Sequence, residues 1–533
     1  GLGDVYKRQI LHAWHERGAE SLDGFRGMFA FALWDSASQT LTLVRDRLGV
    51  KPLYYADLGG TLIFGSEIKA LLAHPKLSRS IDPEALATYL ALGFQPGERS
   101  MLSAVRQVPP GSLLTVTAGG EPQLRRWWDF SGVEAAAASQ SSDQRTAADD
   151  AERLERLEAH LTETVRLRMV SDVPVGAFLS GGIDSSLIVA LMARQSSEPV
   201  RTFSIGFDFA SFDERPYARM VAEHVGARHE EFVVDANLAE LLPRLVWHYD
   251  DPFADPSMIP TFRVAEIAAR HVTVALSGDG GDELFAGYPL YDRLLWTQKK
   301  VGCIPRNLRM PIARAAEALL PVGFKGRVWL QGLETDLQQG LPLIAAHFDR
   351  STRRRLMAGQ GAWALAAERI REQRIPKTAD LLQRATRMDL ENYLPEDILV
   401  KVDRASMLNS LEVRAPLLDY RLIEFAFGKV PSHLKATATS RKVLLKKLTA
   451  RLLPSEFDQN RKQGFSIPLG SWLQSGPWQV FFREVLLGSD NTLFDHKVLS
   501  NLLAGQAKGR ANGERLFALV MFELWRREYQ VSI

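Results

Sequence analysis

Two glycine-rich turns carry hydroxyl and carboxylate groups suited to binding phosphate. FLSGGIDSSL spans residues 178–187, and LSGDGGDELFAGY spans residues 276–288. Each follows an apolar run typical of a strand, and the first leads directly into a helical pattern. Serine hydroxyls, unhindered glycine amides and the positive end of a helix all attract an anion. We therefore interpret the two turns as parts of one phosphate site.

Other interpretations of the first turn fit its residues less well. A nucleophile elbow needs a serine between two glycines, whereas Ser180 precedes Gly181 and Gly182. A Walker P-loop needs a lysine after its last glycine, and no lysine occurs between residues 170 and 195. A plain strand-to-helix turn remains an alternative for either motif alone. The occurrence of two such motifs in one chain favours phosphate binding.

Because the first turn has no P-loop lysine, another cation has to neutralise the phosphate charge. Asp184 lies in the first turn and Asp282 in the second. Carboxylate and phosphate oxygens are the ligands that Mg²⁺ prefers. Parallel strands end at the same edge of a sheet, where ligands bind. We expect the two turns to lie side by side, with Asp184 and Asp282 sharing one magnesium ion.

The rest of the sequence predicts an α/β protein with two kinds of sheet. Residues 24–66 alternate apolar runs with turn-forming breaks, which predicts antiparallel strands. Residues 119–150 contain few large apolar side chains, as a linker would. Strand and helix patterns then alternate, which predicts a parallel sheet, and beyond about residue 290 the pattern is mostly helical. The basic stretch from Arg441 to Arg451 is interpreted as a solvated helix face.

Length and composition narrow the class of protein. A chain of 533 residues exceeds the size of one typical core, so we expect at least two domains. Lys plus Arg number 65 and Asp plus Glu 63, a balance that argues against nucleic-acid binding. The single cysteine, Cys303, rules out an intramolecular disulfide and a Cys-rich zinc site. Without a long apolar run or a signal sequence, we expect a cytoplasmic protein that does not bind membranes.

Three later segments make the pattern specific: KVDRASM at 401–407, LEVRAPLLD at 411–419 and RKQGFSIPLGSW at 461–472. Together with the two turns, they resemble in order the synthetase domain of glutamine-dependent asparagine synthetases, whose ATP site is a pyrophosphatase-type loop, or PP-loop. Upstream, FRGMFAFALWD, RDRLGVKPLYY and FGSEIKAL resemble the later part of that family's glutaminase domain. This resemblance implies an N-terminal-nucleophile (Ntn) fold of two β layers between helices, followed by a PP-loop domain with a mostly helical C-terminal part.

The resemblance also implies the reaction. Glutamine would be hydrolysed at a first site, and ammonia would pass through a tunnel to the second. There, aspartate would react with ATP, with Mg²⁺ bound, to give β-aspartyl-AMP and pyrophosphate. Ammonia would then displace AMP and leave asparagine. The implied partners are aspartate, ATP and ammonia, with glutamine in the full-length parent, and a homodimer is one assembly open to the chain.

Individual roles follow from the matched motifs. Lys462 matches the family lysine that steadies charge on the α-phosphate, although a solvated surface lysine is the alternative. Asp279 stands where some relatives carry Glu and would take a proton from the attacking ammonia, or else only cap its own turn. Arg404 and Arg414 fit either phosphate or carboxylate partners. The implied metal ligands are Asp184 and Asp282. The implied ATP-binding residues are Leu179, Ser180, Gly181, Gly182, Asp184, Ser185, Ser186, Ile205, Ser277 and Gly278.

The resemblance is incomplete at the N-terminus. The family's nucleophile is an N-terminal cysteine whose free α-amine acts as the base, whereas this chain begins GLGDVYKRQ and the match starts near Ile10. We expect residues 1–9 to be a non-native leader, 10–118 a truncated glutaminase domain, 119–150 a linker and 151–533 the synthetase domain. We also expect this chain to lack glutaminase activity.

Other functions remain open on the sequence alone. A relative that makes a different amide, such as a sugar amidotransferase or a β-lactam-forming or peptide-cyclising enzyme, would share the ATP site. A non-catalytic regulator that only binds nucleotide is a second alternative, although the intact Asp184, Asp282 and Lys462 argue against it.

Overall fold

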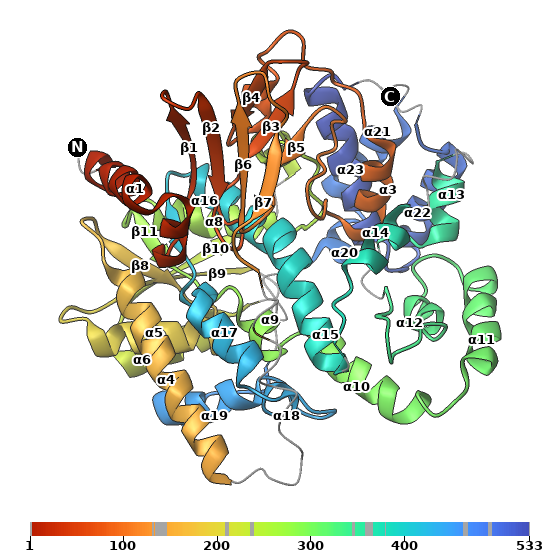
Figure 1. Cartoon of the computed structure of the whole chain (residues 1–533). Helices are drawn as coiled ribbons and strands as arrows, with labels where there is room; N and C mark the ends of the chain where they lie inside the picture. Colours follow the sequence, from red (N-terminus) through yellow and green to blue (C-terminus); the bar gives the residue numbers. More distant parts are fainter. Residues whose placement is uncertain are drawn as a thin grey trace.

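The computed structural model describes residues 3–129, 133, 147–207, 213–234, 239–343, 347–357, 366–378, 380–461, 467–488 and 493–531. Over these residues, a layer of antiparallel strands is followed by a parallel sheet and then by helices (Figure 1). The predicted α/β fold class is confirmed, including the mostly helical C-terminal part.

The N-terminal part contains two antiparallel sheets. One has the strand order β1-β2-β6-β7, with bounds Ala30–Asp35, Thr40–Arg45, Ser112–Thr117 and Gln123–Arg126. The other has the order β4-β3-β5, with bounds Leu62–Gly65, Tyr54–Asp57 and Arg106–Gln107. The helices of this part are α1 (Gly3–Arg17), η1 (Gly18–Gly24), α2 (Ile68–Leu71) and α3 (Pro83–Leu92).

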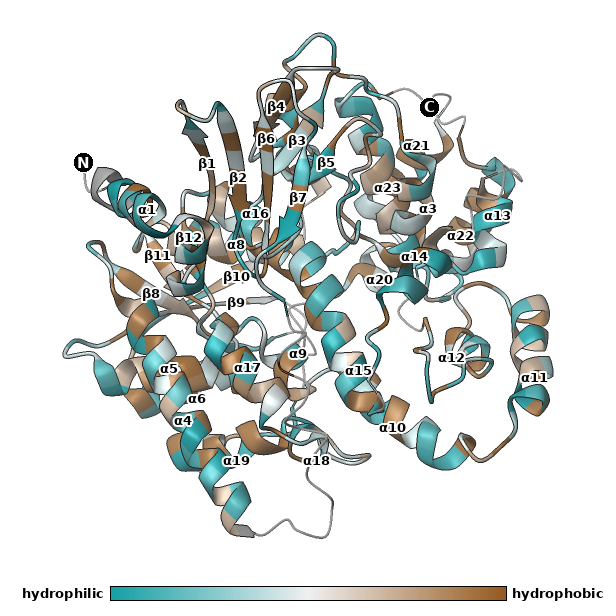
Figure 2. Cartoon of the chain, in the orientation of Figure 1, coloured by the Kyte–Doolittle hydropathy of each residue, from teal (hydrophilic) through white to brown (hydrophobic). Residues whose placement is uncertain are grey.

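Strand β7 lies inside residues 119–150, the range predicted as a linker. All four of its residues are exposed, so the strand shows none of the apolar alternation by which a sequence reveals a strand. Figure 2 shows it as a hydrophilic strand. Its place in the sheet is fixed by antiparallel pairing with β6 rather than by side-chain burial.

The five-stranded sheet has the order β10-β9-β8-β11-β12, and every neighbouring pair is parallel. The strand bounds are Val175–Phe178 for β8, Arg201–Phe207 for β9, Arg228–Val234 for β10, Val274–Leu276 for β11 and Glu412–Arg414 for β12. In Figure 1, α4 (Ala147–Met169), α5 (Ile183–Gln195) and α6 (Arg215–Val225) lie below this sheet. α8 (Met258–Ala268) and α16 (Leu399–Met407) lie above it, toward the N-terminal strands.

Burial of both faces explains the apolar character of these strands. In β11, Val274 and Leu276 pack into the cluster formed with α4 and α5, whereas Ala275 packs into the cluster formed with α8. A parallel sheet covered on both faces requires apolar residues at successive positions.

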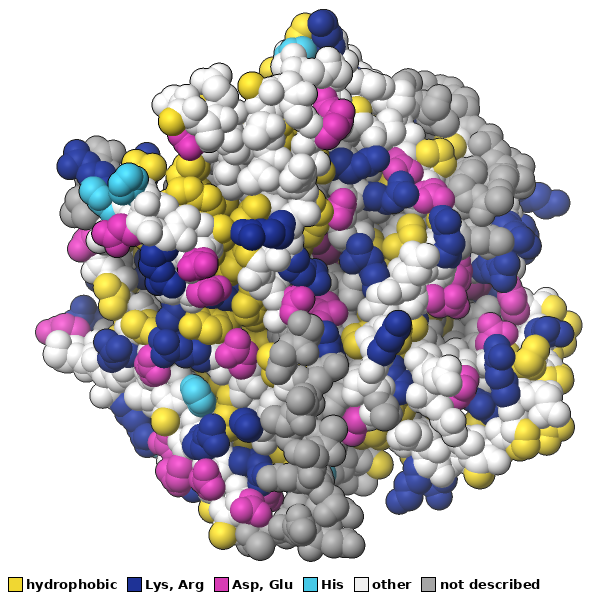
Figure 3. Space-filling view, viewed as in Figure 1, with side chains coloured by type: hydrophobic (Ala, Val, Ile, Leu, Met, Phe, Trp, Pro, Cys, Tyr) yellow, Lys and Arg dark blue, Asp and Glu magenta, His cyan; other side chains and the backbone are white. Residues whose placement is uncertain are grey.

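The remaining elements are helical. Their bounds are η5 Ala239–Leu241, α7 Leu242–Tyr249, α9 Gly281–Phe285, α10 Pro289–Val301, α11 Arg306–Leu319, α12 Arg327–Gly332, α13 Arg350–Leu356, α14 Ala366–Arg374, α15 Leu381–Met388, the π-helical η7 Asp389–Ile398, η8 Pro416–Leu418, α17 Tyr420–Gly428, α18 Ser432–Lys435, α19 Val443–Leu452, α20 Leu469–Trp472, α21 Pro477–Leu487, α22 His496–Ala507 and α23 Gly513–Glu528. None of the helices within the described ranges is long and apolar enough to cross a membrane. Figure 3 shows positive and negative side chains interspersed on the face in view.

A buried lysine in α18 provides a test of this packing. Lys435 has no exposed surface; its Nζ donates to Gln383 Oε1 at 3.3 Å and lies 3.9 Å from the centroid of the Phe427 ring. Burial lowers the pKa of Lys435 from 10.5 to about 7. Between these two pKa values the unfolded chain binds the proton more tightly than the folded chain does. Lys435 therefore lowers the free energy of unfolding most below pH 7, and this penalty decreases as the pH rises toward 10.5.

We therefore expect Lys435→Met to raise the melting temperature at pH 7 by a few degrees. The advantage over the wild type should shrink as the pH is raised toward 10, as thermal unfolding at several pH values would show. Lys429→Met, at an exposed position of the same region, serves as the matched control and should change little. A Lys435→Met protein less stable than the wild type at pH 7 would contradict this explanation.

Candidate functional site

The two glycine-rich turns lie side by side. β8 and β11 are neighbours in parallel register, with Val175 opposite Val274 and Ala177 opposite Leu276, so both turns leave the same edge of the sheet. The predicted adjacency is therefore confirmed. The turns are in contact, because a Cβ placed on Gly278 would lie 2.7 Å from the backbone nitrogen of Ser185.

This close approach explains why position 278 is a glycine. We expect Gly278→Ala to push the turns apart and to weaken the nucleotide binding predicted for them at least about tenfold, as titration with ATP would measure, because the added Cβ meets backbone rather than a movable side chain. Gly24→Ala is the matched control, since no atom lies within 4 Å of the Cβ it would add. Wild-type affinity for ATP in Gly278→Ala would show that the packing of the turns is not needed.

Hydroxyl groups hold the first turn in shape. Ser180 Oγ lies 3.0 Å from Ser185 Oγ, and it accepts a hydrogen bond of 3.3 Å from the backbone N–H of Gly182. Gly181 has φ +71, and a Cβ there would lie 2.6 Å from Tyr217 Cβ on α6. The turn is thus fixed on one side by α6 and opens on the other at the N-terminus of α5, a position that attracts anions.

A buried lysine joins the carboxylates of the two turns. Lys442 Nζ pairs with Asp184 Oδ2, and it lies 2.5 Å from Asp282 Oδ1. Burial opposes the charged ammonium, but the two carboxylates outweigh burial and raise the pKa of Lys442. The predicted metal ligands therefore do converge, and a cation from this chain lies between them.

The interpretation of residues 441–451 as a solvated face is wrong at Lys442. The side chain of Lys442 is buried, and the residue has a left-handed backbone conformation (φ 52) just before α19 begins. Helical periodicity does not apply to a residue outside the helix. The run of basic residues therefore gave no sign that Lys442 contacts the two carboxylates. Acidic side chains in both turns, without a nearby lysine in either, were the available signal that a distant cation was needed.

The edge of the sheet borders a cavity of about 620 Å³. The predicted residues that line it are Leu179, Ser180, Gly182, Asp184, Ser185, Ile205, Ser277, Gly278, Asp279 and Asp282. Gly181 and Ser186 do not line it, because Gly181 backs onto α6 and Ser186 is fully buried within α5. Lys462 lies outside the described residues.

The cavity also contains buried ionisable groups that the sequence analysis did not identify. Lys401 Nζ donates to Asp255 Oδ2 at 2.8 Å. Burial opposes the charge on each, but their pairing outweighs it, lowering the pKa of Asp255 and raising that of Lys401. Burial, with Asp282 nearby, raises the pKa of Glu283 to about 8. Lys401 belongs to KVDRASM, and its place between two valines, Val400 and Val402, was the signal that could have identified it.

Asp279 makes the turn contact predicted as one of its alternatives, and it also lines the cavity. Its Oδ2 accepts a hydrogen bond of 2.7 Å from Ser277 Oγ, which caps the turn. Its side chain also faces the cavity, and burial raises its pKa above the usual value. A raised pKa makes this carboxylate a stronger base than an ordinary aspartate.

A second, smaller cavity of about 40 Å³ lies between the N-terminal strands and the parallel-sheet part. Its lining includes Met28 and Val50 from the N-terminal part. Ser277, Asp279 and Val402 line both cavities. The two cavities therefore adjoin at the second glycine-rich turn.

Comparison with known proteins agrees with this arrangement. The asparagine synthase family matches residues 156–527, and the glutamine amidotransferase domain family matches residues 8–128. The glutamine-hydrolyzing asparagine synthetase 1 of Bacillus subtilis is 32% identical over 97% of this chain and 80% of that protein. A putative glutamine-hydrolyzing asparagine synthetase of Mycobacterium bovis is 34% identical over 97% of this chain and 78% of that protein. Amidase chyE of Penicillium rubens is 27% identical over 80% of this chain and 66% of that protein. A family match over more than half of the chain, joined to relatives of this similarity, shows that the chain belongs to the family of glutamine-dependent asparagine synthetases.

Proposed function

We propose that this chain makes asparagine from aspartate, ATP and ammonia by way of β-aspartyl-AMP. The observation that carries the proposal is the meeting of two glycine-rich turns at one cavity, with Asp184 and Asp282 directed at a single cation. Family membership supports ATP as the nucleotide and glutamine as the nitrogen source.

In the first step, the two turns hold the triphosphate at the edge of the sheet. In this proposal Ser180, Gly182 and Ser185 contact the phosphates, and Leu179 and Ile205 contact the nucleoside. That all five line the cavity supports these roles. An oxygen of the aspartate side-chain carboxylate bonds to the α-phosphorus. The bond from that phosphorus to the oxygen bridging the β-phosphorus breaks, and pyrophosphate leaves. Holding both reactants in one cavity supplies the orientation that this displacement needs.

Asp184 and Asp282 fit a magnesium site. Both carboxylates already converge on a cation, the ammonium of Lys442, so their positions suit a divalent ion that also binds phosphate oxygens. Bound there, Mg²⁺ would neutralise phosphate charge. We propose that Lys462 steadies the charge on the α-phosphate from its segment beyond the described residues.

In the second step, ammonia displaces AMP. Its nitrogen bonds to the side-chain carbonyl carbon, the bond from that carbon to the oxygen shared with AMP breaks, and a proton passes to Asp279. The adjoining cavities support a route for ammonia to the acyl carbon from the N-terminal domain, which the glutamine amidotransferase domain family matches. The boundary near Met28 and Val50 would be its entrance on the N-terminal side.

A product assay tests this function. The protein is incubated with ATP, Mg²⁺, ammonium and each of a panel of carboxylates that includes aspartate, glutamate and β-amino acids. We expect AMP, pyrophosphate and asparagine in equal amounts with aspartate. An amide formed only from another carboxylate would show that the chain makes a different amide. Formation of ADP and phosphate would contradict adenylation.

A further inference from the structure

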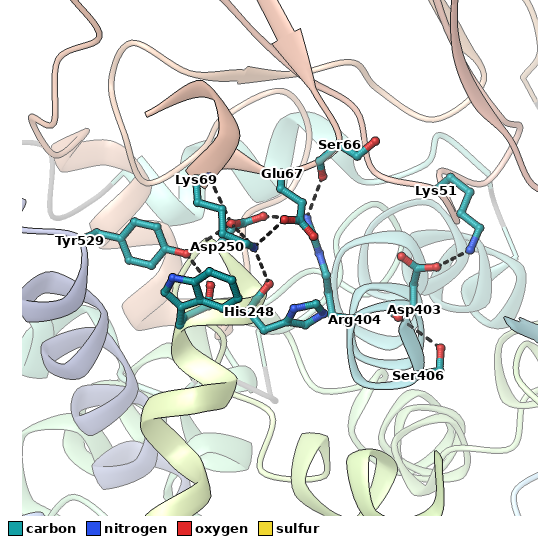
Figure 4. Close-up of polar contacts among 11 residues, drawn as sticks. Lys51, Ser66, Glu67, Lys69, His248, Asp250, Asp403, Arg404, Ser406 and Tyr529 are labelled. Carbon is teal, nitrogen blue, oxygen red and sulfur yellow. Dashed lines mark hydrogen bonds and ion pairs between the residues drawn. The ribbon is translucent and has the colours of Figure 1, made fainter. Parts of the chain in front are cut away.

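Helix α16 links the synthetase cavity to the N-terminal domain through three charged residues close together in sequence. Lys401 lines the synthetase cavity, where it pairs with Asp255. Asp403 and Arg404 pair instead with side chains of the N-terminal domain (Figure 4). A single helix of nine residues therefore has contacts on both sides of the domain boundary.

The contact at Asp403 reaches a firmly held segment. Lys51 Nζ lies 2.6 Å from Asp403 Oδ1. The backbone N–H of Lys51 donates to Asp46 Oδ2 at 3.0 Å, and its carbonyl accepts from Arg45 Nε at 2.9 Å. Arg45 and Asp46 are themselves buried. The Lys51 anchor is thus built into the N-terminal domain rather than carried by a loose surface side chain.

The contact at Arg404 is buried as well. Its guanidinium donates to the carbonyl of Ser66 at 3.1 Å, and it lies 3.5 Å from Glu67 Oε1 and 3.1 Å from Asp250 Oδ2. Asp250 also binds Lys69 Nζ at 2.9 Å. The cluster therefore joins α16, the C-terminal end of α7 and the N-terminal domain (Figure 4). The choice left open by the sequence for Arg404, phosphate or carboxylate, is resolved toward carboxylate.

Asp250 is held in an unusual conformation that keeps this cluster in place. Its φ is +69, a region that residues other than glycine seldom adopt. Its carboxylate accepts from Tyr529 Oη at 3.2 Å, and its carbonyl accepts from Trp525 Nε1 at 2.5 Å. The C-terminal helix α23 and the residue that follows it thereby brace the same anchor. Such strain persists only where surrounding contacts fix the residue.

We propose that Asp403 and Arg404 are positioning residues, which fix α16 to the N-terminal domain so that the ammonium of Lys401 is held in the synthetase cavity, where it binds the acceptor carboxylate. The proposal rests on the proposed function, because it assigns Lys401 to the part of that cavity where the acceptor carboxylate binds. A short helix held by two ion pairs keeps the position of its other side chains better defined than a helix without such contacts. The N-terminal domain then contributes to the synthetase site even when ammonia is supplied from solution.

The test uses reversal of the Lys51–Asp403 pair in the full chain. Lys51→Glu places two carboxylates together, and the double variant Lys51→Glu, Asp403→Lys restores an opposite-charge pair. We expect Lys51→Glu to raise the KM for aspartate at least about fivefold with saturating ammonium, while the KM for ATP stays the same. We also expect faster amide hydrogen exchange across residues 399–407. Both effects should return toward wild type in the double variant.

The controls separate positioning from general destabilisation. Arg219→Gln removes an ion pair of the same 2.6 Å length, Arg219 with Glu231, that is distant from α16 in the fold, and it should leave both readouts unchanged. Lys51→Met, which removes the pair without repulsion, should show a smaller effect of the same kind if Lys51→Glu folds poorly. Unchanged hydrogen exchange and KM in both Lys51 variants, or failure of the charge reversal to restore them, would overturn the proposal. If the wild type formed no amide from any carboxylate, the proposed function would fail, while hydrogen exchange would still report whether Lys51 and Asp403 fix α16.

Discussion

Replacement of Asp184 by asparagine is expected to lower AMP formation at least about a hundredfold, because a neutral amide removes half of the negative charge that gathers a cation between the two turns. Asparagine keeps the shape of the side chain, so the packing of Gly278 and Gly281 against it should survive. Initial rates of pyrophosphate release measure the effect. Raising the Mg²⁺ concentration should recover part of the lost rate.

Asp57→Asn is the matched control for this variant. Asp57 is an exposed aspartate at the end of β3, distant from the parallel sheet, and the same substitution there should leave AMP formation unchanged. A folded Asp184→Asn protein with the wild-type rate would remove Asp184 from the magnesium site.

Lys442→Met is expected to have the second large effect. The substitution leaves the carboxylates of Asp184 and Asp282 facing each other without their ammonium partner, and removing one member of a buried ion pair typically costs about 3–5 kcal/mol. We expect a lower melting temperature and at least a tenfold slower formation of AMP. Because Mg²⁺ can replace the missing positive charge, added Mg²⁺ should raise the melting temperature of Lys442→Met more than that of the wild type.

Lys447→Met, in the helix α19 that Lys442 precedes, provides the comparison. Lys447 makes an exposed pair with Asp150 at 3.7 Å, a kind of contact worth about 0–1 kcal/mol. Its removal should change neither the melting temperature nor its dependence on Mg²⁺. If Lys442→Met responded to Mg²⁺ no more than the wild type does, Lys442 would not act as the resident cation between the carboxylates.

The spacing of apolar residues along the sequence predicted those strands whose side chains are buried. The runs that became β1, β2, β3 and β4 have apolar residues broken by turns, and the alternation of strands and helices after residue 151 indicated the parallel sheet. The adjacency of the two turns followed from the same reasoning, since parallel strands end at one edge. β7 was not predicted because its residues are exposed and only its backbone pairs with β6.

The sequence predicted the residues of the site that belong to one short motif. It did not predict contacts between segments that are far apart in the chain. Ser180, Asp184 and Asp282 lie in turns whose glycine, serine and aspartate residues indicate phosphate or metal binding. Lys442 comes from a segment more than two hundred residues away from Asp184, and only the fold brings the two together. Ser186 lies away from the cavity because the turn motif continues into a helix, where successive residues point in different directions.

The contacts of α16 were hidden for the same reason. The pairs Lys51 with Asp403 and Glu67 with Arg404 join segments separated by hundreds of residues, and one sequence offers no sign of such pairing. The motif KVDRASM drew attention to the helix without revealing which partner each charge would have.

The path of oxygen through the reaction tests the central claim most directly, namely that the two turns present the α-phosphorus of ATP to a carboxylate. Aspartate labelled with ¹⁸O in its side-chain carboxylate is incubated with the protein, ATP, Mg²⁺ and ammonium, and the nucleotide product is analysed by mass spectrometry. Transfer of one ¹⁸O atom into AMP is the predicted result, because the oxygen that attacks phosphorus leaves with AMP. Appearance of the label in inorganic phosphate together with ADP would contradict the account, since it would place the attack at the γ-phosphorus.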